Sequence, residues 1–433
     1  MDLKDRIAHD LADAHAHTDA LLAPVDDARL HVQHDPIMSP LVWDYGHVAV
    51  YQELWLVQQL SGVAPTDDAR MHHYDAFENP RRVRAALPLM SRAEVAEYRG
   101  VVDSKSLALL EEADVDGNPD PLLRSGYVYD MIVQHEHQHC ETLLQTLQLM
   151  QGGYGVTLPA LPGGREVALD TVSIPAGRYP IGSDEHAPYD NEHPVVWVDL
   201  DGFSIDRFPV TSGQYAEFVE DGGYTREWLW SPAGWEWLQG DGAATAAPKH
   251  WQRRDGGWWT QRFGHDKPVD MRTPVMHVCW HEAQAYCRWA GRRLPTEAEW
   301  EVAATWDARV HRKRRYPWGD EAPTLEHANL DQRLFGAAPV GAYPRGASAF
   351  GCEQMIGDVW EWTSSDFAPY PGFRAFPYRE YSEVFFGPDY KVLRGASWAA
   401  RASVSRATFR NWDYPIRRQI FAGFRCVDLE ATR

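Results

Sequence analysis

The sequence predicts an α+β protein of two domains, with a helical N-terminal domain and a mixed, loop-rich C-terminal domain. The chain has 433 residues, which is long for a single domain. Apolar residues recur at helical spacing up to residue 151, whereas short β-like runs rich in Trp and Gly follow. The Gly- and Pro-rich stretch GGYGVTLPALPGG begins at residue 152. We therefore expect a helical domain at 1–151, a linker at 152–168 and a second domain at 169–430.

The first two helices of the N-terminal domain are predicted from an apolar face and from end signals. The opening helix places apolar side chains on one face, at Leu3, Ile7, Leu11 and Leu22. Ser39 and Pro40 provide an N-cap and a first-turn proline for a second helix, which we expect to continue to Gly62.

Two further helices complete a predicted four-helix bundle. Ser91 and Glu94 have the spacing of a capping box, and the helix after them continues to about Ala113. Pro121 is expected to open the last helix, which stops at Gly152. Four helices with intervening loops favour a bundle. The loop from about 62 to 90 is long for such a fold, and long loops are often functional.

The C-terminal domain is predicted to mix short strands with short helices. Its β-like runs are TVSIPAG, VVWVDLDGFSI and KVLRGASW. One short helix is HEAQAYCRWAG, and another begins at the capping box of Thr296 and Glu299.

Composition indicates a globular protein and excludes several classes. The chain is 44% hydrophobic and 24% charged, which is ordinary for a folded protein. Its 42 basic and 62 acidic residues give a net charge of −20, which disfavours a nucleic-acid partner. We find no apolar run of about 18 residues, no signal peptide and no CxxC pair among the five cysteines. The expected location is the cytoplasm, with no membrane segment.

Three histidines at alternate positions in QHEHQHCET indicate a metal site. At about 100° per residue on a helix, His135 and His139 lie about 40° apart, while His137 points to nearly the opposite side. The pair also matches the H-E-x-x-H pattern of metalloproteases, in which Glu136 would be the base beside the metal. A metalloprotease needs a third ligand downstream of the pair.

The other candidate ligand lies upstream, at His47 in WDYGHVAVYQE. A bundle can bring two helices to one metal, so that His47, His135 and His139 form a three-histidine site with open positions. Open positions suit a catalytic site, because a structural site would be closed by a fourth protein ligand. Three imidazoles suit Fe, Zn, Cu or Ni alike. We assign no metal role to His137, His72 and His73.

Longer motifs in both halves carry a family resemblance. MSPLVWDYGH at 38–47 and HEHQHCET at 135–142 resemble the DinB-type helical domain of ergothioneine-biosynthesis sulfoxide synthases. The second half resembles the formylglycine-generating-enzyme domain, which has a C-type-lectin-like core. Its matching strings are PVMHVCWHEAQAYCRWAGRRLPTEAEWEVAA (274–304), YPWGDE (316–321), GCEQMIGDVWEWTSS (351–365), LRGASW (393–398) and FAGFRC (421–426). Together the two resemblances cover nearly the whole chain.

The second domain departs from the formylglycine-generating enzymes themselves. Those enzymes carry a copper-binding cysteine pair after the LRGASW motif, whereas AARASVSRATFRNW here has no cysteine. The resemblance therefore implies a sulfoxide synthase, which uses Fe(II) and O2 to join a thiol sulfur to C2 of the imidazole of hercynine (Nα-trimethylhistidine). The positions that match the family's iron ligands are His47, His135 and His139. Gln138 matches a residue near the trimethylammonium end of hercynine.

The same resemblance suggests the thiol donor. In the actinobacterial branch, which uses γ-glutamylcysteine, an Arg pair precedes LPL and an aspartate follows NW near the C-terminus. Arg81 and Arg84 match the pair, and an Arg pair can bind carboxylates bidentately. Asp413 matches the aspartate, which would meet the α-ammonium of the γ-glutamyl group. Asn411 and Trp412 would lie against hercynine.

The family also implies a catalytic tyrosine on a loop of the second domain that reaches the iron. The loop here is APYPGFRAFPYREYSEVFF, with Tyr370, Tyr378 and Tyr381 as candidates. We favour Tyr378 as the proton donor, with Tyr381 next. The bundle would thus supply the iron ligands, and the second domain would supply substrate contacts and the acid.

Alternative functions remain at this stage. One is a related synthase that uses cysteine or a selenium donor in place of γ-glutamylcysteine, or plain histidine in place of hercynine. Another is a Zn-dependent DinB-type thiol transferase or hydrolase, which would turn over without O2. The alternative that is not an enzyme is a metal-stabilised, lectin-like binding module.

Overall fold

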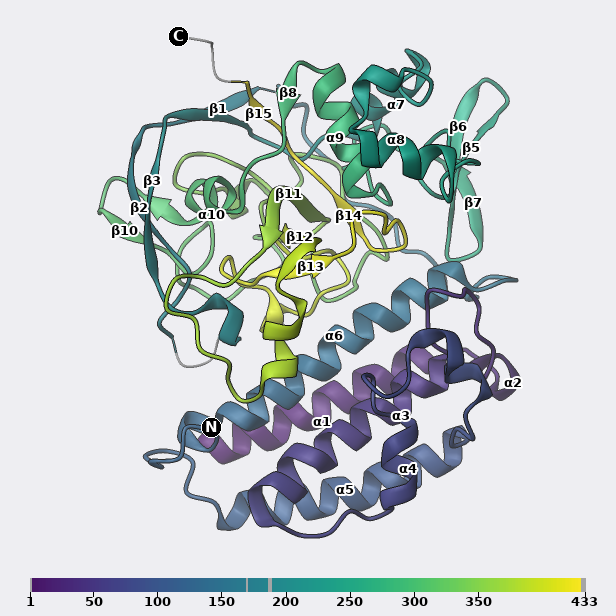
Figure 1. Cartoon of the computed structure of the whole chain (residues 1–433), viewed down its shortest axis with the longest axis vertical. Coiled ribbons are helices and arrows are strands. Elements are labelled where there is room, and N and C mark those ends of the chain that lie inside the picture. The colour runs from purple at the N-terminus through teal and green to yellow at the C-terminus, as the bar shows by residue number, and fades with distance from the viewer. Residues whose placement is uncertain (1, 169, 186–188, 430–433) are drawn as a thin grey trace. The chain divides into compact units, whose positions relative to one another are not determined.

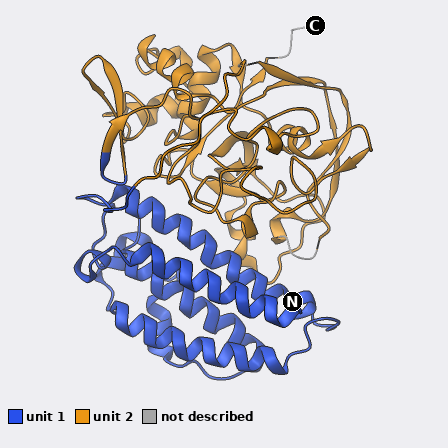
Figure 2. Ribbon diagram, turned by 180° about the vertical axis from the view of Figure 1, so that it is seen from behind, with its two compact units in different colours: residues 1–157, 263–265 blue, residues 158–262, 266–433 orange. Residues whose placement is uncertain are grey.

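The computed structural model of the chain describes residues 2–168, 170–185 and 189–429. It divides into two compact units, which Figure 2 shows in different colours. Unit 1 comprises residues 1–157 and 263–265, and unit 2 comprises residues 158–262 and 266–433. This division falls inside the stretch 152–168 that was expected to be a linker. The expected domain limits at 169 and 430 lie outside the described residues.

Unit 1 is a helical bundle (Figure 1). Its helices are α1 (Leu3–Leu22), α2 (Asp27–Leu30), α3 (Leu41–Gln52), α4 (Asp68–His73), α5 (Arg92–Glu112) and α6 (Tyr127–Leu149). Helix α6 packs against both α1 and α3, and α3 also packs against α5. Every residue of α3 is buried, so this helix forms the centre of the bundle.

Two predicted helix ends are wrong. Helix α6 begins at Tyr127 rather than at Pro121, because Ser125 and Gly126 have φ values of 54° and 73° and break the helical path. Ser39 does not cap α3, since Pro40 is the N-cap residue and makes no side-chain cap bond. The predicted capping boxes at Ser91 and Thr296 are present, each with its glutamate three residues later.

The end of α3 has an irregular helical continuation. Residues Glu53–Gln59 form a π-helical segment, η1, a conformation that is rare and often found at functional sites. Glu53 is buried there, where its carboxylate accepts hydrogen bonds from the Tyr98 hydroxyl and the Thr66 backbone N–H. The second helix thus extends close to its predicted end.

Unit 2 combines short helices with several small sheets. Its helices are α7 (Ser212–Glu220), α8 (Pro232–Gln239), α9 (Trp280–Trp289) and α10 (Glu297–Thr305). Its strands are β1 (Thr171–Ile174), β2 (Gly177–Ile181), β3 (Val196–Leu200), β4 (Phe203–Asp206), β5 (Trp251–Arg254), β6 (Gly257–Arg262), β7 (His265–Pro268), β8 (Arg292–Arg293), β9 (Trp306–Asp307), β10 (Arg312–Lys313), β11 (Trp360–Phe367), β12 (Gly387–Arg394), β13 (Asn411–Asp413), β14 (Ala422–Gly423) and β15 (Val427–Asp428).

Two four-stranded sheets organise unit 2. Their strand orders are β1-β4-β15-β8 and β13-β12-β11-β14. In the second sheet β12 pairs antiparallel with β11 and β13, while β14 runs parallel to β11. Strand β13 therefore lies at an edge. Bulges between Trp362 and Phe367 interrupt the register of β11 with β12, and such bulges bend a strand and redirect its side chains.

The core of unit 2 contains fully buried ion pairs. Arg394, Arg410 and Arg425 are among its largest buried side chains. The Arg394 guanidinium contacts Glu301 at 2.6 Å and Arg425 contacts Glu361 at 2.6 Å. Because an unpaired buried charge is very costly, these pairs fix the segments that carry them relative to one another.

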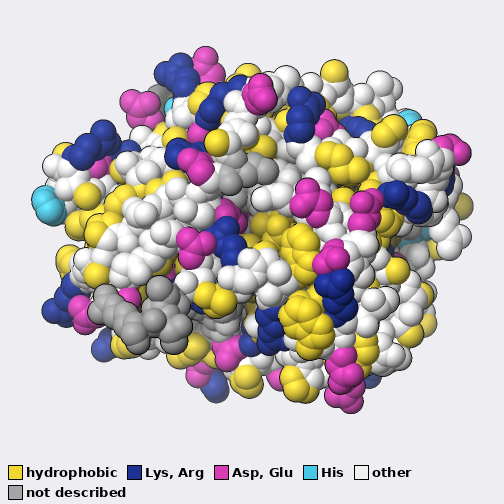
Figure 3. Space-filling model, turned by 90° about the horizontal axis from the view of Figure 1, so that it is seen from above, with side chains coloured by type: hydrophobic (Ala, Val, Ile, Leu, Met, Phe, Trp, Pro, Cys, Tyr) yellow, Lys and Arg dark blue, Asp and Glu magenta, His cyan; other side chains and the backbone are white. Residues whose placement is uncertain are grey.

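The surface agrees with the composition. On the face in Figure 3, acidic and basic side chains are interspersed with apolar ones. No helix of the described residues is long and apolar enough to cross a membrane.

Candidate active site

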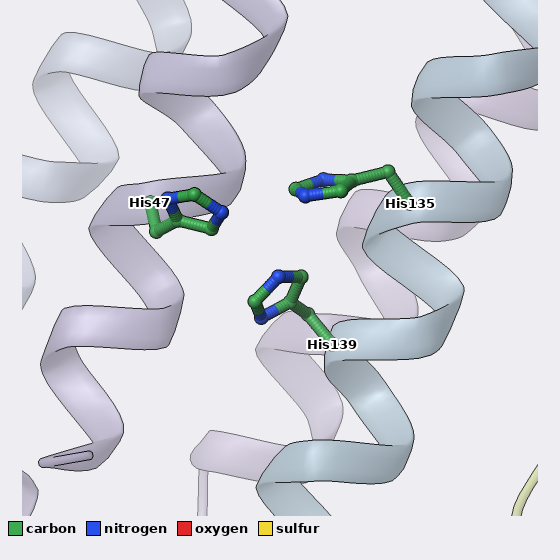
Figure 4. Close-up of side chains that lie close together, drawn as sticks. All are labelled: His47, His135 and His139. Atoms are coloured by element: carbon green, nitrogen blue, oxygen red, sulfur yellow. The ribbon is translucent and has the colours of Figure 1, made fainter. Parts of the chain in front are cut away.

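Three histidines of unit 1 converge on one point (Figure 4). His47 projects from α3, and His135 and His139 project from successive turns of α6. One ring nitrogen from each lies within 4.8 Å of the other two. Among the described residues this is the group of His, Cys, Asp and Glu side chains with the geometry of a metal site. The structure thus brings together the three predicted ligands, with neither His72 nor His73 in the group.

Hydrogen bonds orient two of these rings. The Nδ1 atom of His47 lies 2.7 Å from the carbonyl oxygen of Tyr74, and Nδ1 of His139 lies 2.9 Å from a carboxylate oxygen of Asp44. A carbonyl and a carboxylate only accept hydrogen bonds, so Nδ1 is the donor in both rings. The Nε2 lone pairs are therefore left for a metal, in the arrangement that proteins commonly use to fix metal-binding imidazoles.

Electrostatics favour the ligand form of the imidazoles. Burial, followed by the proximity of His139, lowers the pKa of both His47 and His135 well below the ordinary value. The rings are therefore neutral near pH 7, and a neutral ring can offer a lone pair to a cation. Among the described residues the group consists of three imidazoles and has no fourth protein ligand, which fits an open transition-metal site.

Aromatic side chains stack on two of the three histidine rings. The Trp43 ring stacks on His47 with centroids 4.6 Å apart. The Tyr51 ring stacks on His135 with centroids 3.8 Å apart. Gln138, the predicted hercynine contact, lies half-buried on α6, between His135 and His139 in the sequence.

The metalloprotease interpretation is wrong for geometric reasons. Glu136 is 2% exposed, and its carboxylate contacts His15 at 2.7 Å and Thr18 at 2.6 Å, both on α1. The base of an H-E-x-x-H enzyme must stand beside the metal. Here it is held by α1 within the bundle, so Glu136 is a structural residue.

The long loop after η1 supplies a contact that the sequence analysis missed. Tyr74, in this loop, provides the carbonyl that orients His47, and its hydroxyl accepts the Met90 backbone N–H at 2.8 Å. Gly46 lies against this ring, and a Cβ at Gly46 would be 2.3 Å from the nearest ring atom. Asp44 was also missed, although it lies one helical turn before His47 and therefore on the same face.

Arg81 and Arg84 lie together on the short 3-10 helix η2 (Arg81–Ala86). Arg81 is half-buried and donates to the carbonyl of Ile37 at 2.8 Å. Arg84 is buried over the ring of Trp43, and it donates to the carbonyl of Asn79 and to the Ser39 hydroxyl. Burial lowers the pKa of Arg84 to about 10. Arg81 is thus the more accessible of the two candidate carboxylate ligands.

The candidates Asn411, Trp412 and Asp413 form β13 in unit 2. Side chains alternate along a strand, so Trp412 faces the side opposite to Asn411 and Asp413. Trp412 stacks on Phe367 with centroids 4.2 Å apart. A carboxylate oxygen of Asp413 lies 3.4 Å from Nε of Arg417.

The three candidate tyrosines differ in environment. Tyr370 is buried and its hydroxyl donates to Glu297, and burial raises its pKa, so it belongs to a buried ionic cluster. Tyr378 and Tyr381 are half-buried at the 3-10 turn η7 (Arg379–Tyr381), with ring centroids 5.6 Å apart. These two therefore stay the candidates for an acid.

The fold and the metal site define a class of protein that combines a DinB-type metal-binding bundle with a formylglycine-generating-enzyme-like domain. Residues 10–143 match the DinB superfamily model. Residues 160–429 match the model of the sulfatase-modifying factor enzyme 1-like domain.

Full-length relatives identify the family. The chain is 46% identical over 430 residues to the hercynine oxygenase of Mycobacterium tuberculosis, covering 97% of this chain and 98% of that protein. It is 46% identical to the hercynine oxygenase of Mycolicibacterium thermoresistibile, covering 99% and 96%. A formylglycine-generating enzyme of M. tuberculosis is 36% identical but matches only 46% of this chain. The chain therefore belongs to the hercynine oxygenase family of ergothioneine biosynthesis, and it is an enzyme.

Proposed function

We propose that this hercynine oxygenase is an Fe(II)- and O2-dependent sulfoxide synthase that uses γ-glutamylcysteine as its thiol substrate. The observation that carries the proposal is the open three-histidine site in a chain that matches hercynine oxygenases over nearly its full length. Three imidazoles suit several first-row metals alike, so the choice of iron rests on the resemblance to the sulfoxide synthases. When bound, Fe(II) would supply the activation of O2 and the coordination of the thiolate.

The overall reaction defines what the protein must do. A thiol, the C2–H of an imidazole and O2 give a C2–S bond with a sulfoxide and one molecule of water. One oxygen atom ends on sulfur and the other in water. The thiol and C2 each lose a proton, so the protein must hold and move protons during turnover. It must also exclude the simpler oxidation of the thiol alone.

Unit 1 positions the ligands and one end of the thiol substrate. Asp44 and the carbonyl of Tyr74 bind Nδ1 of His139 and His47, so that Nε2 of both rings would be available to hold the metal. Arg81 would bind a carboxylate of γ-glutamylcysteine, because it is half-buried and has donors beyond its one bond to Ile37.

Arg84 would act at the same carboxylate. Several of its donors already serve Asn79 and Ser39, and the ring of Trp43 fixes its plane. The guanidinium of Arg84 would therefore be fixed before the substrate binds, and its side chain would lose little conformational entropy on binding.

Unit 2 would supply the remaining substrate contacts. Asp413 would accept the α-ammonium of the γ-glutamyl group, an interaction that free cysteine, which has no γ-glutamyl group, lacks. Asn411 and Trp412, together with Gln138 of unit 1, would bind hercynine; an indole ring is a good partner for a trimethylammonium cation. Tyr378 would deliver the proton that directs the reaction towards C–S bond formation, with Tyr381 as the second candidate.

The decisive experiment measures oxygen uptake by the Fe(II)-loaded protein with hercynine and γ-glutamylcysteine, with products analysed by mass spectrometry. Uptake that requires both substrates and yields their sulfoxide conjugate is expected. Uptake with cysteine or a selenium compound in place of γ-glutamylcysteine would reassign the donor. Turnover of a thiol without O2 in zinc-loaded protein would instead establish a thiol transferase.

Matched variants test the two residue assignments. Tyr378→Phe should retain iron but divert oxygen into thiol oxidation to the sulfinate, whereas Tyr381→Phe should largely keep the sulfoxide yield. The reverse result would move the acid to Tyr381. Asp413→Asn should raise KM for γ-glutamylcysteine without changing KM for hercynine, and an equal effect on both would contradict the donor assignment.

A further inference from the structure

The segment that carries Tyr378 and Tyr381 has one buried residue beyond Tyr370. Within residues 371–390, all of which the structure describes, Ser382 is the single buried residue, with 0% of its surface exposed. Tyr378 and Tyr381 are half-buried, and η7 and the turn η8 (Glu383–Phe385) contain no buried residue. Phe385 and Phe386 are half-buried, and their rings contact those of Trp412 and Phe367. Because the segment has no fully buried apolar side chain, the polar contacts of Ser382 contribute strongly to holding the part that carries the tyrosines.

Ser382 is held by polar groups of the 3-10 turn η4 (Asp190–Glu192). Its hydroxyl donates to one carboxylate oxygen of Asp190 at 2.5 Å and accepts a hydrogen bond from the Asn191 amide at 3.0 Å. The other carboxylate oxygen of Asp190 accepts the backbone N–H of Phe376 at 3.2 Å. Asp190 thus holds the loop at two points, one on each side of Tyr378 and Tyr381.

The turn that carries Asp190 is itself fixed in unit 2. The buried carboxylate of Glu192 accepts hydrogen bonds from the guanidinium of Arg406 and from the Thr408 hydroxyl. The carbonyl of Asn191 accepts a hydrogen bond from the buried Arg410 at 2.7 Å. Because these partners are buried, η4 provides a rigid base for the loop.

The anchor is connected to the tyrosines through ring contacts. Tyr189, the residue before η4, lies with its ring 4.8 Å from that of Tyr381. Tyr381 in turn lies 5.6 Å from Tyr378. A change in the position of Ser382, which is adjacent to Tyr381 in the chain, would therefore shift both hydroxyl groups.

The charge of Asp190 is retained at a cost. Asp190 is 3% exposed, and burial raises its pKa to about 6 in spite of the donors from Ser382 and Phe376. This desolvation cost is offset in part by the two hydrogen bonds that the carboxylate accepts from Ser382 and Phe376.

We propose that Asp190 and Ser382 are positioning residues, which hold the loop of Tyr378 and Tyr381 in the conformation that delivers the proton for C–S bond formation. This inference rests on the proposed function. It explains in structural terms why the enzyme would form the sulfoxide rather than oxidise the thiol alone. The carboxylate and the serine hydroxyl act through the tyrosine loop and do not themselves contact the reacting atoms.

The test uses Ser382→Ala and Asp190→Asn in the full-length, Fe(II)-loaded protein. Ser382→Ala removes the hydroxyl, and Asp190→Asn replaces one acceptor oxygen by an amide that cannot accept the second donor. Amide hydrogen exchange in residues 376–386 should accelerate by about 10- to 100-fold, as expected when a hydrogen bond to a charged group is lost. The sulfoxide share of the products should fall and the sulfinate share should rise, while iron affinity stays unchanged.

Ser405→Ala is the matched control. Ser405 is also a buried serine of unit 2, and its hydroxyl donates to the carbonyl of Arg401 at 2.7 Å. The control should leave both loop exchange and product ratio at their wild-type values. Unchanged loop exchange in both test variants, or a loosened loop with an unchanged product ratio, would overturn the proposal.

The two proposals fail in different ways. If the wild-type protein forms no sulfoxide conjugate, the proposed function fails, and the exchange data still decide whether Asp190 and Ser382 anchor the loop. If the wild type forms the conjugate and the two variants keep its full yield, only the positioning role fails.

Discussion

The candidate residues of the two units are held in place by different means. In unit 1 the three histidines lie on two long helices of a bundle, and their spacing along α6 and the packing of α3 against α6 bring them together. In unit 2 the candidate residues lie on an edge strand and on a loop whose part at residues 371–386 has one buried residue, Ser382. A loop has no periodicity that fixes its position, so buried polar groups distant in the sequence must do so. A helical site is thus encoded locally, whereas a loop site depends on its anchors.

The largest expected effect removes the helical site itself. His135→Ala should abolish iron binding and reduce oxygen uptake to background, because two imidazoles cannot retain the metal in an open site. Iron content and oxygen uptake measure this. The control His72→Ala changes an exposed histidine outside the metal group and should leave both unchanged. If His135→Ala retained iron, His135 would not be a ligand, and the metal site would not be built on the spacing of histidines along α6.

The next effect concerns the buried ion pairs of unit 2. Arg425→Met leaves the carboxylate of Glu361 buried without its cation, which should cost about 3–5 kcal/mol of unfolding free energy. Denaturant unfolding measures the loss. Arg253→Met, which breaks an exposed pair with Glu220, should cost less than about 1 kcal/mol. Equal losses would show that burial does not distinguish the two pairs.

The hydrogen bond that orients His139 should matter through metal affinity. Asp44→Ala removes the acceptor at Nδ1 and should weaken Fe(II) binding by about 10- to 100-fold. Asp44→Asn keeps an acceptor without the charge and should lose less. Metal titration against a competing chelator gives both values. Unchanged affinity in the Ala variant would mean that helix packing alone orients the ring.

A small steric change should reach the site through the loop between η1 and α5. Gly46→Ala places a Cβ 2.3 Å from the Tyr74 ring, so the ring must shift, and a shift of the Tyr74 backbone with it would disturb the hydrogen bond from His47 to its carbonyl. We expect a loss of about 1–3 kcal/mol in stability, as for overpacking, together with weaker iron binding. Gly100→Ala on α5 meets nothing within 4 Å and should be neutral or slightly stabilising. Thermal unfolding of the two variants compares them directly.

The last expected effect is a pH dependence of the bundle. Burial opposes the charge of His15, but the Glu136 carboxylate and the contact with Asp103 raise its pKa from 6.5 to about 10. A pKa raised by folding means that the stabilisation is complete below pH 6.5 and is lost as the pH rises towards 10. The thermal midpoint of unit 1 should fall over this range. In His15→Gln the slope should flatten, and an unchanged slope would assign the effect to another group.

The sequence by itself determined the parts of the protein that follow from local periodicity or from long motifs. Helical spacing predicted the pairing of His135 with His139 and excluded His137 from their face. The capping boxes at Ser91 and Thr296 predicted two helix starts. Motifs in both halves identified the two domains, which the family models match at residues 10–143 and 160–429.

Other features were decided only by tertiary structure, because they join residues that are distant in the chain. The sequence allows Glu136 to be a base beside a metal, and only the contact of its carboxylate with His15 on α1 excludes that role. Nothing in the sequence distinguishes Tyr74 from the rest of a long loop, whereas the structure places its carbonyl at Nδ1 of His47. Asp190 and Ser382 are separated by 192 positions, and neither belongs to a recognisable motif. A sequence shows which side chains share a helix face, whereas the partner of a buried polar group is chosen when the chain packs.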